Sequence, residues 1–222
     1  MTFLVIAGFR TYQWVMGYVL AQSVLAGDVR TTERMLTFAP ILDVNRQFDG
    51  RGYLHQAATF GNLDMLKLLL KQPGIDVNIE TYKGFSPITP GLTPLYVAAS
   101  YSQVYNTTKF VCHLVHDPRV LINERIDDGS TALSYAVESG GVDAAKCIIA
   151  TGQILNMTGV NLSEDSTLDC NLKFTDSEYT YLGTAMVHRK MCNRRYIQQL
   201  LLEYQADRDT VIARVRADLD WK

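Results

Sequence analysis

The strongest constraint on the fold is a phrase of aliphatic residues closed by an asparagine, which returns along the chain at Pro40–Asn45, Pro73–Asn78, Pro118–Asn123 and Gly152–Asn156. Asn45 and Asn78 lie 33 residues apart, and so do Asn123 and Asn156. Self-similarity at this period is typical of small structural units stacked in a row. We therefore expect a repeat protein in which each unit buries its apolar stripe against the next.

Each unit reads as a helix, a turn and a second helix. The Thr93 hydroxyl can cap a helix start while Pro94 occupies the first turn, where no N–H is needed. The pairs Ala57-Ala58 and Ala98-Ala99 keep one helix face small, and Gly61 suits a left-handed turn. A second helix follows from the leucine spacing, and Pro73 ends it: Leu63, Leu66, Leu69 and Leu70.

These residues resemble the ankyrin repeat family. Gly91–Ala99 is similar to the family's Thr-Pro-Leu-His-x-Ala phrase, with Tyr96 in place of the histidine, and Tyr53–Ala58 and Gly129–Ala136 are related phrases. The resemblance covers residues 18–209 and implies an all-α ankyrin-repeat solenoid of stacked helix-turn-helix units with extended finger loops. It also implies that His55, at the usual histidine position, serves the architecture through hydrogen bonds.

The expected organisation has an N-terminal apolar capping helix at 1–17, an ankyrin repeat domain at 18–209 and a C-terminal capping helix at 210–222. The repeats are expected at 18–48, 49–81, 91–126, 127–158 and 179–209, with inserted fingers at 79–91 and 157–180. Arg10, Gln13 and Gln22 interrupt the apolar N-terminus, which favours a packed helix over a signal peptide or membrane span.

The composition excludes several classes of function. The chain has 222 residues and a net charge of -2, which gives no indication of nucleic-acid binding. The basic cluster from His188 to Arg195 is interpreted as a solvated face. Phosphate-binding, HExxH and GxSxG motifs are absent from the sequence, so we expect no enzyme and no cofactor. Four scattered cysteines favour reduced thiols.

One alternative is a cryptic enzyme or metal site around Cys112 and His116, whose i to i+4 spacing could place two ligands on one helix face. We favour a structural interpretation, with Cys112 in the core and no metal bound. A second alternative keeps protein binding as the activity but places it in a pathogen. Eroded repeats with uneven insertions also resemble those of bacterial or viral effectors that bind or mimic a host protein.

The most consistent function is binding of another protein through the concave face and the finger loops, as an adaptor or scaffold. The candidate contacts are aromatic side chains and two acidic residues of the longer finger, 157–180. They are Tyr82, Phe85, Tyr96, Tyr101, Tyr105, Glu164 and Asp165. We expect a cytoplasmic chain, or one in the host cytoplasm if it is an effector. It is expected to be a monomer when unbound, with no nucleic-acid partner and no membrane association.

Overall fold

Antiparallel pairs of helices make up nearly all of the regular structure. The computed structural model describes residues 2–38, 42–82, 91–101, 108–126, 129–157, 160, 162 and 182–221. The elements in these residues are α1 (Thr2–Leu25), α2 (Val29–Phe38), β1 (Gln47–Phe48), β2 (Arg51–Gly52), α3 (Tyr53–Phe60), α4 (Leu63–Leu70), α5 (Pro94–Ser100), α6 (Thr108–Val115), α7 (Ala132–Ser139), α8 (Val142–Ala150), α9 (Leu182–Ala206) and α10 (Arg208–Asp218).

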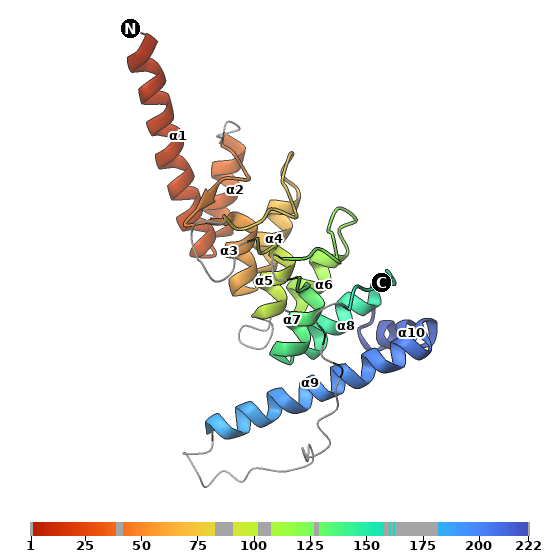
Figure 1. Cartoon of the computed structure of the whole chain (residues 1–222). Helices are drawn as coiled ribbons and strands as arrows, with labels where there is room; N and C mark the ends of the chain where they lie inside the picture. The colour runs from red at the N-terminus through yellow and green to blue at the C-terminus, as the bar shows by residue number, and fades with distance from the viewer. Residues whose placement is uncertain are drawn as a thin grey trace.

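The helices form two layers along one stack (Figure 1). The first helices of successive units, α1, α3, α5, α7 and α9, contact one another in that order. The second helices, α2, α4, α6, α8 and α10, make a parallel row behind them. The expected all-α solenoid of helix-turn-helix units is confirmed.

Local sequence explains where the helices begin and end. The Thr93 hydroxyl accepts a hydrogen bond from the Tyr96 N–H at 3.3 Å, and Pro94 is the first residue of α5. Asn62 caps α4 by accepting from the Met65 N–H at 3.0 Å. Gly61 ends α3 with a φ of 63°, a left-handed conformation that favours glycine.

The core runs through the whole stack between the two layers. Small side chains on the first helices, including Ala58, Ala98 and Ala136, are fully buried and let neighbouring helices approach closely. The second helices contribute larger side chains, among them Leu66, Leu114 and Ile148. Each unit therefore completes its core with residues of the next one, as a solenoid requires.

Both ends of the stack differ from the expected division. α1 runs without a break through residue 17, so the expected capping helix and the first helix of the first unit are one element. At the other end, α9 is one unbroken helix over most of the repeat expected at 179–209. α10 packs on α8 and α9 and thus takes the place of the fifth second helix.

The cysteines correct a further expectation. Cys112 of α6 and Cys147 of α8 form a disulfide, with 4.9 Å between their Cα atoms, and Cys192 is also disulfide-bonded. Reduced thiols were expected because the cysteines are scattered in sequence. The 35-residue separation is close to one repeat, however, so the stack brings Cys112 and Cys147 to adjacent positions on neighbouring second helices.

Candidate functional site

One side of the stack carries the loops that follow each second helix and the fingers that lead into the next unit. We call this side the finger edge and define it by its described residues: 42–52, 75–82, 91–93, 119–126, 129–131 and 152–157. The first finger is the hairpin β1–β2, in which Gln47 pairs with Gly52 and Phe48 with Arg51. Gln47 Nε2 donates to the Glu80 carbonyl at 2.7 Å and so joins the first finger to the second.

Three asparagines join successive loops of the finger edge. Asn45 Nδ2 donates to the Gly74 carbonyl at 2.8 Å, and Asn45 Oδ1 accepts from the Asp76 N–H at 2.8 Å. Asn78 makes the same pair of bonds with the Arg119 carbonyl and the Leu121 N–H. Asn123 makes the same pair of bonds with the Ile154 carbonyl and the Asn156 N–H, which lie two residues further along the repeated phrase than their counterparts. This asparagine ladder, Asn45, Asn78 and Asn123, holds the edge in a fixed register.

His55 connects the second unit to the third. Its Nδ1 accepts from the Gly52 N–H at 3.1 Å, and its Nε2 donates to the Leu92 carbonyl at 2.7 Å. The side chain is fully buried, and this desolvation lowers the pKa of His55 to about 4. The ring is therefore neutral at physiological pH, which supports the architectural role that the resemblance implies.

The residues two positions before the asparagine that closes each copy of the repeated phrase form a second row along the edge. Asp43 and Asp76 occupy this position in the first two loops, and Leu121 and Ile154 occupy it in the next two. All four are exposed, Leu121 by 54% and Ile154 by 77%. The row thus changes from acidic to aliphatic along the stack. Exposed aliphatic side chains next to this ladder are suited to contact another surface.

Of the expected contact residues, Tyr82 has the exposure that such a role requires, at 68%. Tyr96 corrects the expectation, because its ring is buried, 4% exposed, and packs on Tyr135 with 4.8 Å between centroids. Tyr101 is half-buried against the core. The remaining candidates lie outside the described residues and stay predictions: Phe85, Tyr105, Glu164 and Asp165.

Sequence reasoning missed Leu121 and Ile154, although a signal was present. The repeated phrase reads Asp-Val-Asn in the first two copies but Leu-Ile-Asn and Ile-Leu-Asn in the last two. The aliphatic residues therefore stand at exposed positions where the first two copies of the phrase have aspartate, which makes Leu121 and Ile154 candidates for a contact surface.

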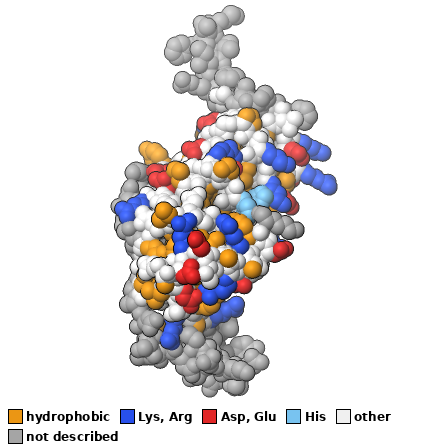
Figure 2. Space-filling model, turned by 90° about the vertical axis from the view of Figure 1, so that its right-hand side faces the viewer, with side chains coloured by type: hydrophobic (Ala, Val, Ile, Leu, Met, Phe, Trp, Pro, Cys, Tyr) orange, Lys and Arg blue, Asp and Glu red, His pale blue; other side chains and the backbone are white. Residues whose placement is uncertain are grey.

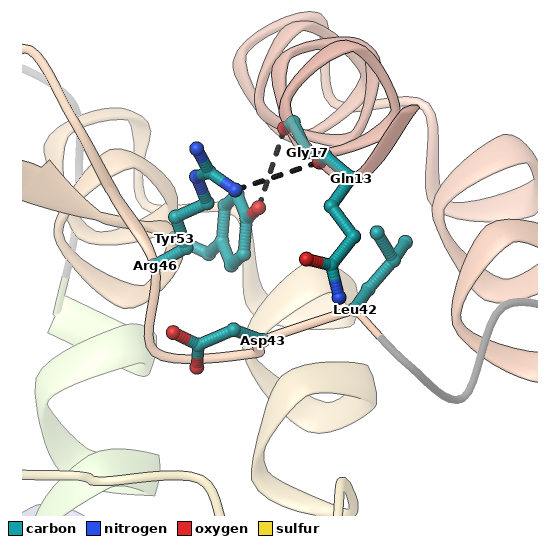
Figure 3. Close-up of a pocket in the computed structure, with 6 residues that line it drawn as sticks. All are labelled: Gln13, Gly17, Leu42, Asp43, Arg46 and Tyr53. Carbon is teal, nitrogen blue, oxygen red and sulfur yellow. Dashed lines mark hydrogen bonds between the residues drawn. The ribbon is translucent and has the colours of Figure 1, made fainter. Parts of the chain in front are cut away.

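A small cavity of about 190 Å³ lies between α1 and the first finger, lined by Gln13, Gly17, Leu42, Asp43, Arg46 and Tyr53 (Figure 3). Tyr53 Oη donates to the Gly17 carbonyl at 3.3 Å, and Arg46 Nη1 donates to the Gln13 carbonyl at 3.5 Å. Burial raises the pKa of Tyr53, which keeps its hydroxyl a donor. These contacts attach α1 to the finger, and the lining holds no cysteine or histidine for catalysis.

The pair Cys112 and His116 does not form a reactive site in this structure. The sulfur of Cys112 is bonded to Cys147, so it supplies no thiolate. His116 Nδ1 lies 2.5 Å from the Cys112 carbonyl oxygen, and its ring stacks on Trp221 with 3.9 Å between centroids. Within the described part of the chain, no group of three or more metal-ligating side chains comes together.

Charge is mixed over the visible surface. On the face in Figure 2, side chains of both signs are interspersed with hydrophobic ones. In the basic cluster, Arg194 donates to the Glu138 carbonyl at 3.0 Å and so serves the packing of α9 on α7. None of the described helices has both the length and the hydropathy to cross a bilayer.

Sequence comparison agrees with the repeat geometry. Residues 54–159 match the family model described as Ankyrin repeats (3 copies). This segment holds α3 to α8 and the asparagine ladder from Asn78 onward. Residues 54–159 are ankyrin repeats. Ankyrin repeats are generally protein–protein interaction modules and are typically non-catalytic.

Several known proteins are similar to part of this chain. The chain is 35% identical over 117 residues to Alpha-latrotoxin-Lg1a of Latrodectus geometricus, covering 52% of this chain and 8% of that protein. It is 36% identical over 107 residues to Alpha-latrotoxin-Lt1a of Latrodectus tredecimguttatus, covering 47% and 7%. SMC5-SMC6 complex localization factor protein 1 of Bos taurus is 33% identical over 103 residues, covering 46% and 9%. The chain thus spans less than a tenth of each relative.

Proposed function

We propose that this chain is a non-catalytic module that binds a partner protein along its finger edge and the adjoining finger loops. The observation that carries this function is the exposed row beside the asparagine ladder, in which Leu121 and Ile154 serve no purpose in the core. The alignments cover less than a tenth of the named relatives, so neither their toxin activity nor their complexes are assigned to this chain.

Rigidity makes such an edge an efficient binding surface. The ladder and the Cys112–Cys147 disulfide hold the loops in place before binding, so little conformational entropy is lost when a partner docks. Leu121, Ile154 and Tyr82 would supply the apolar contact area. Asp43 and Asp76 give the N-terminal half of the edge a preference for basic groups, and Glu164 and Asp165 of the long finger would add to it.

The test is an affinity capture with four forms of the chain: wild type, Leu121→Lys with Ile154→Lys, a deletion of residues 163–176, and the control Phe60→Lys with Met191→Lys. The control places two lysines at exposed apolar positions away from the finger edge. We expect the edge variant to lose a specific protein that the wild type and the control retain. Equal recovery by all four forms would refute the finger edge as the binding surface.

The disulfides also bear on location. Disulfides persist in oxidising compartments and are uncommon in the cytosol. With Cys112, Cys147 and Cys192 all bonded, we infer an oxidising compartment in place of the expected cytoplasmic one. Non-reducing peptide mapping should recover a cross-linked peptide pair containing Cys112 and Cys147, and recovery of both as free thiols would restore the cytoplasmic interpretation.

A further inference from the structure

The part of α1 with described side chains, residues 11–25, is apolar around almost its whole circumference. One side packs into the core through Gly17, Leu20, Ala21 and Val24. The other side is exposed and carries six large hydrophobic side chains: Tyr12, Trp14, Val15, Tyr18, Val19 and Leu25. Residues 11–25 contain no charged residue. A helix that is apolar on all sides is normally covered on all sides.

The place of α1 in the stack shows what kind of element would cover it. Every interior first helix lies between two others, as α3 lies between α1 and α5. Helical spacing puts Tyr12, Val15 and Val19 on the side of α1 opposite its buried face, where a further first helix would lie, and Trp14, Tyr18 and Leu25 on the flank beside it. The exposed face of α1 therefore has the position and character of an interior helix face.

The other end of the stack is finished differently. The exposed positions of α10 are mostly charged: Arg208, Asp209, Arg214, Arg216 and Asp218. Terminal units of a solenoid need such a polar outer face to stay soluble on their own. α10 has this face and α1 does not, so α1 is built for contact.

We propose that the covering element is α1 of a second copy, so that two chains associate through their N-terminal helices. The two faces would be uncharged, so the pairing brings no like charges together. The absence of Lys and Arg from residues 11–25 argues against an anionic lipid surface, which such helices bind through basic residues. This association differs from the monomer expected from the sequence.

The aromatic side chains of this face are held in place before contact. The rings of Trp14 and Tyr18 are stacked with 5.9 Å between centroids, and Tyr18 meets Phe48 of the first finger edge-on at 6.3 Å. From the usual areas of such side chains, the six expose roughly 500 Å² per copy. Two copies would bury about 1,000 Å², which reaches the area that a weak, reversible interface needs.

Sedimentation equilibrium of the full chain, from about 1 to about 100 µM, tests this association. We expect the wild type to dimerise in that range. A lysine variant, Trp14→Lys with Tyr18→Lys, and a glutamate variant, Trp14→Glu with Tyr18→Glu, should each weaken dimerisation at least about tenfold. An equimolar mixture of the two should recover a heterodimer. The control Phe60→Lys with Met191→Lys should dimerise as the wild type does.

Circular dichroism on each variant separates lost association from lost folding, since both exposed side chains can change without disturbing the core. A wild type that stays monomeric up to about 100 µM would overturn the proposal, and so would dimers that persist in both charged variants. A monomeric wild type that binds phosphatidylcholine vesicles would assign the face to lipid and overturn it equally.

Discussion

At the scale of single residues, a few polar side chains do what continuous secondary structure does in other folds. Asn45, Asn78 and Asn123 each use both atoms of the side-chain amide to bind the backbone of the next unit. His55 binds the Gly52 N–H of its own finger with one ring nitrogen and the Leu92 carbonyl of the next finger with the other. The register of the stack therefore depends on side chains that a composition count would class as surface polar residues.

Replacing Asn78 with alanine should lower the free energy of unfolding by about 2 kcal/mol, since two hydrogen bonds between units are lost at a partly exposed site. Urea denaturation would measure the change. Gln153→Ala removes an exposed amide from the same edge and is the control, with an expected effect within about 0.5 kcal/mol. Equal effects of the two substitutions would contradict the role given to the ladder.

The stability of the fold should fall as the pH falls from about 6.5 toward 4. Burial holds the pKa of His55 at about 4 in the fold, below its ordinary value of 6.5, so the unfolded chain binds the proton more readily. Between pH 7.5 and pH 5 this costs about 2 kcal/mol of unfolding free energy. Urea unfolding at both pH values should show this loss in wild type and a smaller one in His55→Gln. An equal loss in the variant would exclude His55 as the cause.

At the scale of elements, equivalent positions of neighbouring units meet because the repeat period places them side by side. The disulfide between α6 and α8 follows from this, and so does the placing of α10 beside α8. The disulfide and the packing of α10 on α8 both join segments whose own sequences do not predict that they meet.

The Cys112–Cys147 disulfide closes a loop of 35 residues and should contribute about 4 kcal/mol to the free energy of unfolding. Reduction should therefore destabilise the wild type by more than it destabilises Cys112→Ala with Cys147→Ala, which retains the disulfide of Cys192. Guanidinium denaturation with and without reductant gives both values. Equal responses of the two proteins would show that this disulfide does not form.

α10 should contribute to stability as a full second helix, because Val211, Ile212 and Val215 are buried against the stack. Val215→Asp places a charge in this contact and should cost at least about 3 kcal/mol. Ala213→Asp introduces the same side chain at an exposed position of α10 and should cost less than about 1 kcal/mol. Thermal unfolding of the two variants compares them, and similar melting temperatures would mean that α10 does not dock.

The sequence predicted the interior of the stack well and its ends poorly. Thr93, Pro94 and Gly61 act through local geometry, so their roles could be read from the residues alone. The burial of Tyr96 and the pairing of Cys112 with Cys147 depend on the neighbouring unit, which a single phrase does not specify. Leu121 and Ile154 were overlooked because aliphatic residues suggest a core until their exposure is known.

At the scale of the whole molecule, the chain is a scaffold with two kinds of surface. The finger edge combines a rigid ladder with an exposed row that changes from acidic to aliphatic, and we assign the partner protein to it. The face of α1 at the N-terminal end is apolar and uncharged, and we assign it to a second copy. The α1 face adjoins the first finger through Tyr18 and Phe48, but Leu121 and Ile154 lie in the loops after α6 and α8, so both surfaces can be occupied in one assembly.

Hydrogen exchange of the chain with and without its captured partner tests the central claim most directly. The partner should slow exchange of backbone amides in residues 119–126 and 152–157, which flank Leu121 and Ile154, while the second helices α4, α6 and α8 keep their rates. Protection confined to those second helices would contradict the assignment of the finger edge as the binding surface.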